Sequence, residues 1–227
     1  MRAFVAAAVV LSATACGGGG DGSAGRAAFS AEVDHPLVPL SSVPVTVLAG
    51  TEDQARIRVE SRVLDTSARI ANADVAVVEV KEWEAGELVE RTLDYYAQRA
   101  DGGVWYFGER VDEYERGKIV GHKGQWRAGR RGAKAGLFMP AKPRVGQEFE
   151  QERAPGVAED RSTVVAVGVA VATPAGKFSS CTKTRDFSPI DNVTELKWYC
   201  SGVGLVREQG AGALVQLVSY RRAASPR

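Results

Sequence analysis

The sequence predicts an all-β protein, folded as a single antiparallel meander sheet that is strongly curled into a half-barrel or open barrel. Apolar and polar residues alternate through residues 56–63, where Ile57, Val59 and Val63 share one face and the charged residues share the other. A strand that is wetted on one side only is typical of an antiparallel sheet. Outside the N-terminus no segment carries a convincing helical stripe, and turn signals separate the alternating segments. The clearest turn signals are Ala85-Gly86, Asp101-Gly102-Gly103, Pro174-Ala175-Gly176 and Gly210-Ala211-Gly212.

The N-terminal residues predict export. Arg2 is followed by an apolar segment of nine residues, Ala3 to Leu11, which is too short to span a bilayer but suits a signal peptide over residues 1–15. The small residues before Cys16 resemble the lipobox of bacterial lipoproteins, in which the cysteine is lipidated and becomes the new N-terminus. The resemblance predicts a protein anchored to a membrane on its extracytoplasmic side. The alternative is ordinary cleavage after Ala15, which would release a secreted protein.

The mature chain divides into three predicted regions. Residues 16–30 start with the lipidated cysteine and continue as a flexible tether rich in glycine. Residues 31–221 form the antiparallel β domain, and residues 222–227 form a disordered tail. Beyond residues 56–63, the alternating patterns predict strands at about 74–83, 87–98, 103–110, 146–152, 162–173, 176–186, 193–200, 203–208 and 213–221.

Two cysteines within the domain predict a disulfide. In an exported protein, an even number of remaining cysteines favours pairing. A symmetric hairpin about the turn at residues 188–192 sets Cys181 directly opposite Cys200, where the two Cβ atoms come close enough for a bridge. Closing that loop of about 20 residues would stabilise the fold by roughly 3 kcal/mol. The alternative is a pair of buried free thiols; no CxxC motif or paired histidine supports a metal site, so we expect no metal or cofactor.

Three aromatic residues are candidates for contact with a ligand. A hairpin about Asp101-Gly102 is expected to place Tyr96 near Phe107, and Gln98 near Trp105. Tyr96, Trp105 and Phe107 would then line a cavity inside the curled sheet. The alternative is that the same side chains pack in the core.

The strand at residues 162–173 is uncharged on both faces. Four valines between Val165 and Val171 alternate with alanine and glycine. This pattern predicts a central strand covered on both sides, with small residues that allow the opposite wall of the sheet to approach closely.

Residues 121–144 are rich in glycine, contain seven basic residues and lack acidic ones, so they predict a long functional or mobile loop. One hypothesis is that its cations meet an anionic envelope component, such as phospholipid head groups or a cell-wall polymer. The candidate residues are Lys123, Arg127, Arg130, Arg131 and Lys134. The alternative is that the loop folds over acidic residues of the preceding strand and the charges compensate locally.

Composition and motifs exclude several classes of function. The chain carries 29 basic and 28 acidic residues, a net charge of +1 that argues against a nucleic-acid-binding protein. Its two histidines, His35 and His122, share no metal-ligand spacing and are expected at the surface. Neither a GxSxG nucleophile elbow nor a phosphate-binding GxxxxGK[ST] loop occurs.

Carboxylates near Glu109 and Glu159-Asp160 are candidates for acid–base chemistry. The sequence does not place them across a cleft from one another. The alternative is that the acidic pair at 159–160 caps backbone N–H groups of a turn. No catalytic residue is therefore assigned.

Four short motifs follow one another along the chain: DYYAQ at 94–98, GVWYFGE at 103–109, MPAKP at 139–143 and APGVAED at 154–160. As a series they resemble a family of bacterial secreted proteins and lipoproteins without an established activity, over most of residues 32–221. The resemblance implies export and carries over no catalytic residue. A curled sheet on a lipid tether is also similar in architecture to the carriers of the lipoprotein-localisation system.

These observations predict a membrane-tethered, non-enzymatic binding module of the cell envelope, whose sheet holds an apolar ligand or a partner segment. The alternatives are a carboxylate-based envelope hydrolase and a structural or assembly protein without a ligand.

Overall fold

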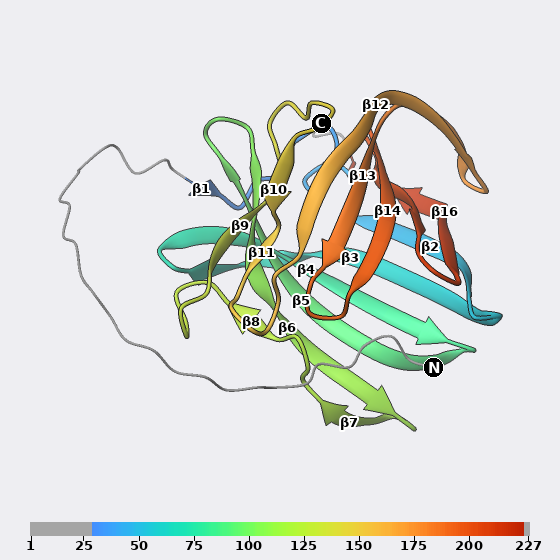
Figure 1. The fold of residues 1–227 in the computed structure, drawn as a ribbon, viewed down its shortest axis with the longest axis horizontal. Coiled ribbons are helices and arrows are strands. Elements are labelled where there is room, and N and C mark those ends of the chain that lie inside the picture. Colours follow the sequence, from blue (N-terminus) through green and yellow to red (C-terminus); the bar gives the residue numbers. More distant parts are fainter. Residues whose placement is uncertain (1–28, 225–227) are drawn as a thin grey trace.

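The computed structural model describes residues 29–224, and these residues form strands and loops without an α-helix. All strands join one antiparallel sheet of 16 strands, which is nearly closed and barrel-shaped (Figure 1). The predicted fold class is confirmed. The predicted signal peptide and lipidated Cys16 lie outside the described residues, as do residues 225–227. The described chain begins at Phe29 in a strand, within the range expected for the tether.

The strands follow the sequence closely. In chain order they are β1 (Phe29–Ser30), β2 (Val45–Glu52), β3 (Ala55–Ile70), β4 (Ala73–Glu84), β5 (Glu87–Arg99), β6 (Val104–Glu115), β7 (Lys118–Gly121), β8 (Trp126–Arg127), β9 (Lys134–Met139), β10 (Glu148–Glu150), β11 (Glu152–Arg153), β12 (Arg161–Thr173), β13 (Gly176–Ser188), β14 (Val193–Cys200), β15 (Gly204–Gln209) and β16 (Ala213–Arg221).

Two meanders form the facing arms of the molecule. Strands β2 to β6 follow one another in the first arm, and strands β12 to β16 follow one another in the second. The last strand pairs with β2, where Leu217 lies opposite Leu48. The predicted meander is therefore correct within each arm, but the arms are joined by strands from opposite ends of the domain (Figure 1).

Residues 148–153 join the two arms at the edges that lie away from β2 and β16. β10 pairs with β12 of the second arm and β11 pairs with β9, which extends the first arm. Only Gln151 separates β10 from β11. On β9, a Cβ atom at Gly136 would collide with the carbonyl of Gln151, so the segment closes the sheet where a side chain has no room.

The hairpin of β13 and β14 has the predicted register. Cys181 lies opposite Cys200, and the two form a disulfide with a Cα–Cα distance of 3.9 Å. The predicted disulfide is confirmed. Symmetry about the turn sufficed because this hairpin has no bulge.

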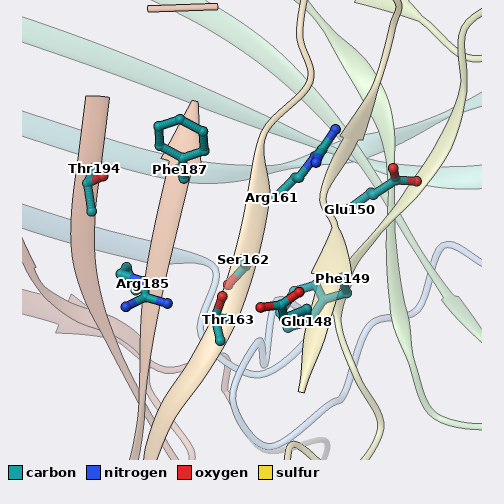
Figure 2. A pocket seen from close by; sticks show the side chains of 9 residues that line it. All are labelled: Glu148, Phe149, Glu150, Arg161, Ser162, Thr163, Arg185, Phe187 and Thr194. Carbon is teal, nitrogen blue, oxygen red and sulfur yellow. The ribbon is translucent and has the colours of Figure 1, made fainter. Parts of the chain in front are cut away.

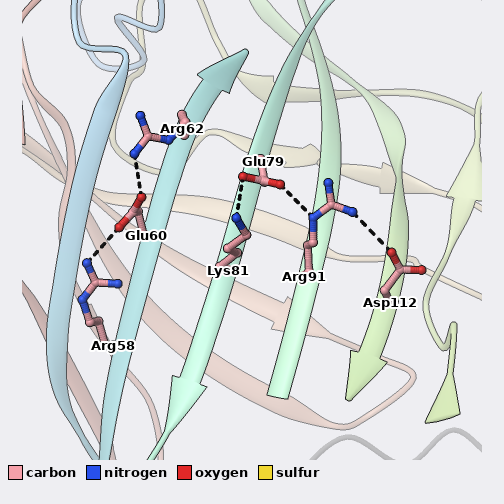
Figure 3. A network of polar contacts seen from close by, with 7 residues as sticks. All are labelled: Arg58, Glu60, Arg62, Glu79, Lys81, Arg91 and Asp112. Atoms are coloured by element: carbon pink, nitrogen blue, oxygen red, sulfur yellow. Dashed lines mark hydrogen bonds and ion pairs between the residues drawn. The ribbon is translucent and has the colours of Figure 1, made fainter. Parts of the chain in front are cut away.

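Salt bridges cover the outer face of the first arm (Figure 3). Glu60 accepts from Arg58 and Arg62 on β3, the strand whose charges predicted a wetted face. On the neighbouring strands, Glu79 binds Lys81 and Arg91, and the same arginine reaches Asp112 at 3.5 Å. Alternating charges on adjacent strands thus compensate one another across this face.

The prediction for residues 121–144 is wrong in one respect, because β8 and β9 lie within them.

β2 was not predicted at all. Its alternation breaks at the apolar run Val47-Leu48-Ala49, and a Cβ on the following Gly50 would collide with the backbone carbonyl of Leu214.

The prediction that residues 162–173 form a strand covered on both sides is also wrong. Val167 is 47% exposed, and irregularities in the register interrupt the pairing of β12 with β13. The end of the strand curls over the second arm, where Arg207 donates a hydrogen bond of 2.7 Å to the carbonyl of Ala172. The small residues therefore permit bending and bulging.

Candidate functional site

The candidate site lies on one face of the sheet, which we call the inner face. In the first arm, Val78, Asp94 and Glu109 form one row of paired residues across β4, β5 and β6. Glu82 and Glu90 are paired on the same face, four residues away along their strands. Lys81 and Arg91, which precede Glu82 and follow Glu90 in their strands, belong to the salt-bridge network of the outer face.

The second arm carries its own row of polar residues. Thr184, Lys197 and Glu208 are paired across β13, β14 and β15, with Asp186 and Glu195 beside them on the same face. Leu196 and Trp198 occupy the alternate positions of β14 and therefore lie on the opposite face from Lys197.

Electrostatic interactions show that the two arms face each other. Glu82 interacts with Glu208, although three strands separate β4 from β15 in the sheet. Glu152 on β11 interacts with both Asp94 and Lys197. Side chains on the convex side could not meet across so many strands, so these rows line the concave side.

Burial and mutual repulsion raise the pKa values of the inner carboxylates. Burial, followed by the charges of neighbouring carboxylates, raises the pKa of Glu82 to about 7 and that of Glu90 to about 7. Both side chains are half-buried. They are surrounded by protein on a concave wall and still touch water.

A second group of acids lies with aromatic side chains at β5, β6 and β11. Asp94 accepts hydrogen bonds from Thr92 at 2.7 Å and from Tyr96 at 3.4 Å. Burial raises the pKa of Asp94 despite these bonds. Burial and the neighbouring carboxylates likewise raise the pKa values of Glu109 and Glu152.

Lys197 is the cation in the polar row that faces inward from the second arm. Its Nζ lies 3.2 Å from Glu195, 3.7 Å from Glu208 and 3.8 Å from Asp186. Burial alone would lower the pKa of Lys197, but the three carboxylates raise it. The amine in turn lowers the pKa of Glu195, whereas burial raises that of Glu208.

In the second arm, one side-chain hydrogen bond joins two strands, while two buried polar atoms have no hydrogen-bond partner among the described residues. Ser162 donates a bond of 2.7 Å to Oδ1 of Asp186, which ties β12 to β13. Among the described residues, Oδ2 of Asp186 and Oγ1 of Thr184 have no hydrogen-bond partner, although both atoms are buried. Such groups mark positions where a ligand or water can bind.

The aromatic residues singled out in the sequence are split between the two faces, because the predicted register is wrong by one residue. Tyr96 pairs and stacks with Tyr106, not Phe107, with ring centroids 4.8 Å apart. Trp105 and Phe107 lie on the outer face, where both contact the ring of Phe29. A bulge in β6 causes the shift, because Phe107 and Gly108 together lie opposite Tyr95, with Gly108 in the left-handed region.

The acidic candidates separate in a similar way. Glu109 lies on the inner face, and Asp160 interacts with it electrostatically. Glu159 instead accepts a hydrogen bond of 3.0 Å from the backbone N–H of Gly156. It therefore caps the turn, as the alternative proposed.

The basic candidates of residues 121–144 are not one patch. Arg127 lies over the ring of Tyr95 at 5.2 Å, and Lys123 lies 3.7 Å from Asp191. The first is a cation–π contact with β5, and the second is an ion pair with the turn between β13 and β14. Arg130, Arg131 and Lys134 are exposed, and their contact with an anionic partner stays a prediction.

The prediction for His35 is wrong, because its side chain is 3% exposed. Nε2 lies 3.2 Å from the carbonyl of Pro140, and Nδ1 accepts from the backbone of Leu37 at 3.1 Å. Burial lowers the pKa of His35, which fits a neutral ring with its proton on Nε2. His122 is exposed, as predicted.

Sequence reasoning missed most of the inner residues. It assigned polar positions to the wetted outer face, so Glu195 and Lys197 were not considered. The alternation in β14 shows that Leu196 and Trp198 point away from Glu195 and Lys197, but no local signal shows which of the two rows faces inward.

Within residues 29–224, no group of three or more His, Cys, Asp or Glu side chains is arranged to hold a metal ion. The same residues include no helix of sufficient length and hydrophobicity to cross a membrane.

Comparison with known proteins adds little to these observations. The sequence matches no family model and no curated protein. Among solved structures, the chain is similar to a candidate lipoprotein from Parabacteroides distasonis, with 13% sequence identity and a TM-score of 0.41. The similarity covers 78% of this chain and 94% of that one. A likeness of this degree carries no conclusion about function or location.

Proposed function

We propose that the protein is a lipid-tethered, extracytoplasmic and non-enzymatic binding module whose inner face holds a cationic ligand. The observation that carries the proposal is the pair of facing rows of carboxylates on the inner face. Within the rows described above, Lys197 is the one amine beside these carboxylates. A polyamine or a lysine-rich segment of a partner protein has the charge that this surface lacks.

The raised pKa values support a cationic ligand for a physical reason. Carboxylates that repel one another are partly protonated near neutral pH, and a bound cation would restore their ionised forms. Binding would therefore release protons. Tyr96 and Tyr106 add aromatic rings to the same face, and such rings also attract ammonium groups.

The ligand class differs from the apolar one expected from the sequence. An apolar ligand would leave the half-buried carboxylates without partners and remove them from water, which is costly. The extracytoplasmic location and the tether rest on the signal peptide and on Cys16.

Calorimetry with spermidine as the probe tests this function. At pH 7.5, in two buffers with different ionisation enthalpies, we expect saturable binding with release of protons. The double substitution Glu82→Gln and Glu90→Gln should weaken binding on the order of tenfold. Glu87→Gln, at the exposed first residue of β5, is the control and should leave the affinity unchanged. Absence of saturable binding, or an equal effect of the control, would refute the proposal.

A carboxylate-based envelope hydrolase is the second candidate. It is favoured by the raised pKa values of Glu109 and Glu152, because a general acid must keep its proton near neutral pH. Release of dye from labelled peptidoglycan, abolished by Glu152→Gln, would support hydrolysis. The absence of turnover by the unsubstituted protein would exclude that activity.

A further inference from the structure

A second candidate site lies on the outer face, away from the acidic rows. A cavity of about 460 Å³ is formed where β10, β12, β13 and β14 lie side by side (Figure 2). Its lining combines two arginines, two glutamates, two phenylalanines and three hydroxyl side chains: Arg161, Arg185, Glu148, Glu150, Phe149, Phe187, Ser162, Thr163 and Thr194.

The register gathers both arginines around one aromatic ring. Arg161 on β12 lies directly opposite Phe187 on β13, and Thr163 lies opposite Arg185. Arg185 and Phe187 are two residues apart on the same strand and so share a face. The arginines are diagonal neighbours, with Cβ atoms about 7–8 Å apart, a spacing that lets two flexible side chains reach one anion.

The guanidinium groups of Arg161 and Arg185 have no ion-pair partner among the described residues. Arg58, Arg62 and Arg91 on the outer face of the first arm each bind a carboxylate. Among residues 29–224, Arg161 and Arg185 form neither an ion pair nor a hydrogen bond through their side chains, and both are exposed. Two unpaired arginines at one cavity attract a phosphate or carboxylate, whose oxygens match the planar donor set of the guanidinium.

The acidic residues at the rim do not cancel this charge. The carboxylate of Glu150 is 3.1 Å from Nε of Arg153, which lies outside the cavity lining. Glu148 adds one negative charge at the far end of β10, opposite Thr163. Glu150 is thus engaged by Arg153, and Glu148 is the lining carboxylate that has no ion pair among the described residues, beside two arginines that also have none.

The base of the cavity is held in place by packing and a hydrogen bond, and one aromatic ring at the cavity is exposed. Phe149 is buried, and the hydrogen bond from Ser162 to Asp186 fixes β12 to β13 beneath the cavity. Phe187, in contrast, is 38% exposed. An exposed ring between two cationic groups can stack on an apolar or aromatic part of a ligand.

We propose that this cavity binds a ligand in which a phosphate or carboxylate is attached to an aromatic or aliphatic group. Arg161 and Arg185 hold the anion, Phe187 packs against the apolar part, and the hydroxyls of Thr163 and Thr194 donate hydrogen bonds to the ligand. The site is separate in face and charge from the proposed cation site.

Titration of the ¹⁵N-labelled mature chain carrying Cys16→Ser, followed by NMR, tests the proposal. The probes are phenyl phosphate, phenylacetate, inorganic phosphate and benzyl alcohol. We expect phenyl phosphate to bind with a Kd near or below about 1 mM and to shift the amide signals of residues 161, 185 and 187. Inorganic phosphate and benzyl alcohol should each bind on the order of tenfold more weakly, because the first lacks the aromatic ring and the second lacks the anion. Comparison with phenylacetate decides between phosphate and carboxylate.

Substitutions separate the two halves of the site. Arg161→Gln and Arg185→Gln should each weaken binding of phenyl phosphate at least about fivefold. Phe187→Ala should weaken phenyl phosphate but leave inorganic phosphate unchanged. The control is Arg56→Gln, at an exposed arginine of β3 whose side chain has no ion pair among the described residues. No saturation by phenyl phosphate, or equal weakening by Arg56→Gln, would overturn the proposal.

Discussion

The ammonium group of Lys197 compensates the charges of neighbouring carboxylates on the inner face of the second arm. Its ammonium group lies within 4 Å of Glu195, Glu208 and Asp186. Removal of one partner from such a group leaves charges that are half-buried and uncompensated. The stability of the second arm should therefore depend on this amine.

We expect Lys197→Met to lower the free energy of unfolding by about 3 kcal/mol at pH 8, and by less at pH 5, where the carboxylates take up protons. Urea denaturation at the two pH values measures the difference. Lys183→Met is the matched control, because Lys183 lies on the outer face of the same hairpin, 4.6 Å from the ring of Trp198. A similar loss in the two variants would contradict a special role of the inner amine.

Glu82 and Glu90 give the stability of the protein a pH dependence. The pKa of each is about 7 in the fold against 4.5 for an ordinary glutamate, so between these pH values the folded state binds more protons than the unfolded state. This contribution to stability is present at low pH and is lost as the pH rises toward 7.

We therefore expect a lower melting temperature at pH 8 than at pH 5, with a contribution on the order of 2 kcal/mol from each carboxyl. The double substitution Glu82→Gln and Glu90→Gln should reduce the difference. Differential scanning calorimetry from pH 5 to pH 8 measures it. A melting temperature that rises across this range would contradict the assignment.

At the scale of elements, the disulfide hairpin is the part that local sequence specifies best. The bridge between Cys181 and Cys200 closes a short loop, and the register of β13 and β14 is regular over its length. The residues of the turn, the symmetry of the hairpin about it and the even number of remaining cysteines sufficed to predict it.

Replacement of both cysteines by alanine should lower the free energy of unfolding by roughly 3 kcal/mol, because the unfolded chain gains the freedom that the bridge removes. Urea denaturation of Cys181→Ala/Cys200→Ala gives the value. The unsubstituted protein in the presence of a reductant should show a comparable loss. No change in either experiment would mean that the bridge is not formed.

The segment that closes the sheet depends on a glycine. Gly136→Ala would place a Cβ against the carbonyl of Gln151 and separate β9 from the closing segment. We expect a loss of about 2 kcal/mol in the free energy of unfolding, with faster amide exchange in β9 and β11. Gly210→Ala is the control, since its nearest neighbour would be Cγ of Glu195 at an ordinary 3.5 Å. Unchanged exchange in β9 and β11 would contradict the close approach.

At the scale of the whole molecule, the described domain begins at Phe29 and Cys16 precedes it in the chain. A lipid on that cysteine would hold the barrel near a membrane through a tether of some ten residues. Neither arm of the sheet is needed for this attachment.

Expression of the chain in a bacterial host tests the anchor. The unsubstituted protein should fractionate with membranes and incorporate labelled palmitate. Cys16→Ser should appear in the soluble extracytoplasmic fraction with an unchanged melting temperature. Membrane association that persists in this variant would contradict lipid anchoring at Cys16.

The sequence by itself determined most of the strands and turns and the disulfide, because these follow from alternation and symmetry over a few neighbouring residues. Only the tertiary structure decided which face of each strand is inside. A period of two shows that Lys197 and Leu196 point in opposite directions, but not which of them faces the opposite arm. The pairing of β2 with β16 and the closure of the sheet by residues 148–153 join segments that are distant in the chain, so Glu82 and Glu208 come together without a local signal in the sequence.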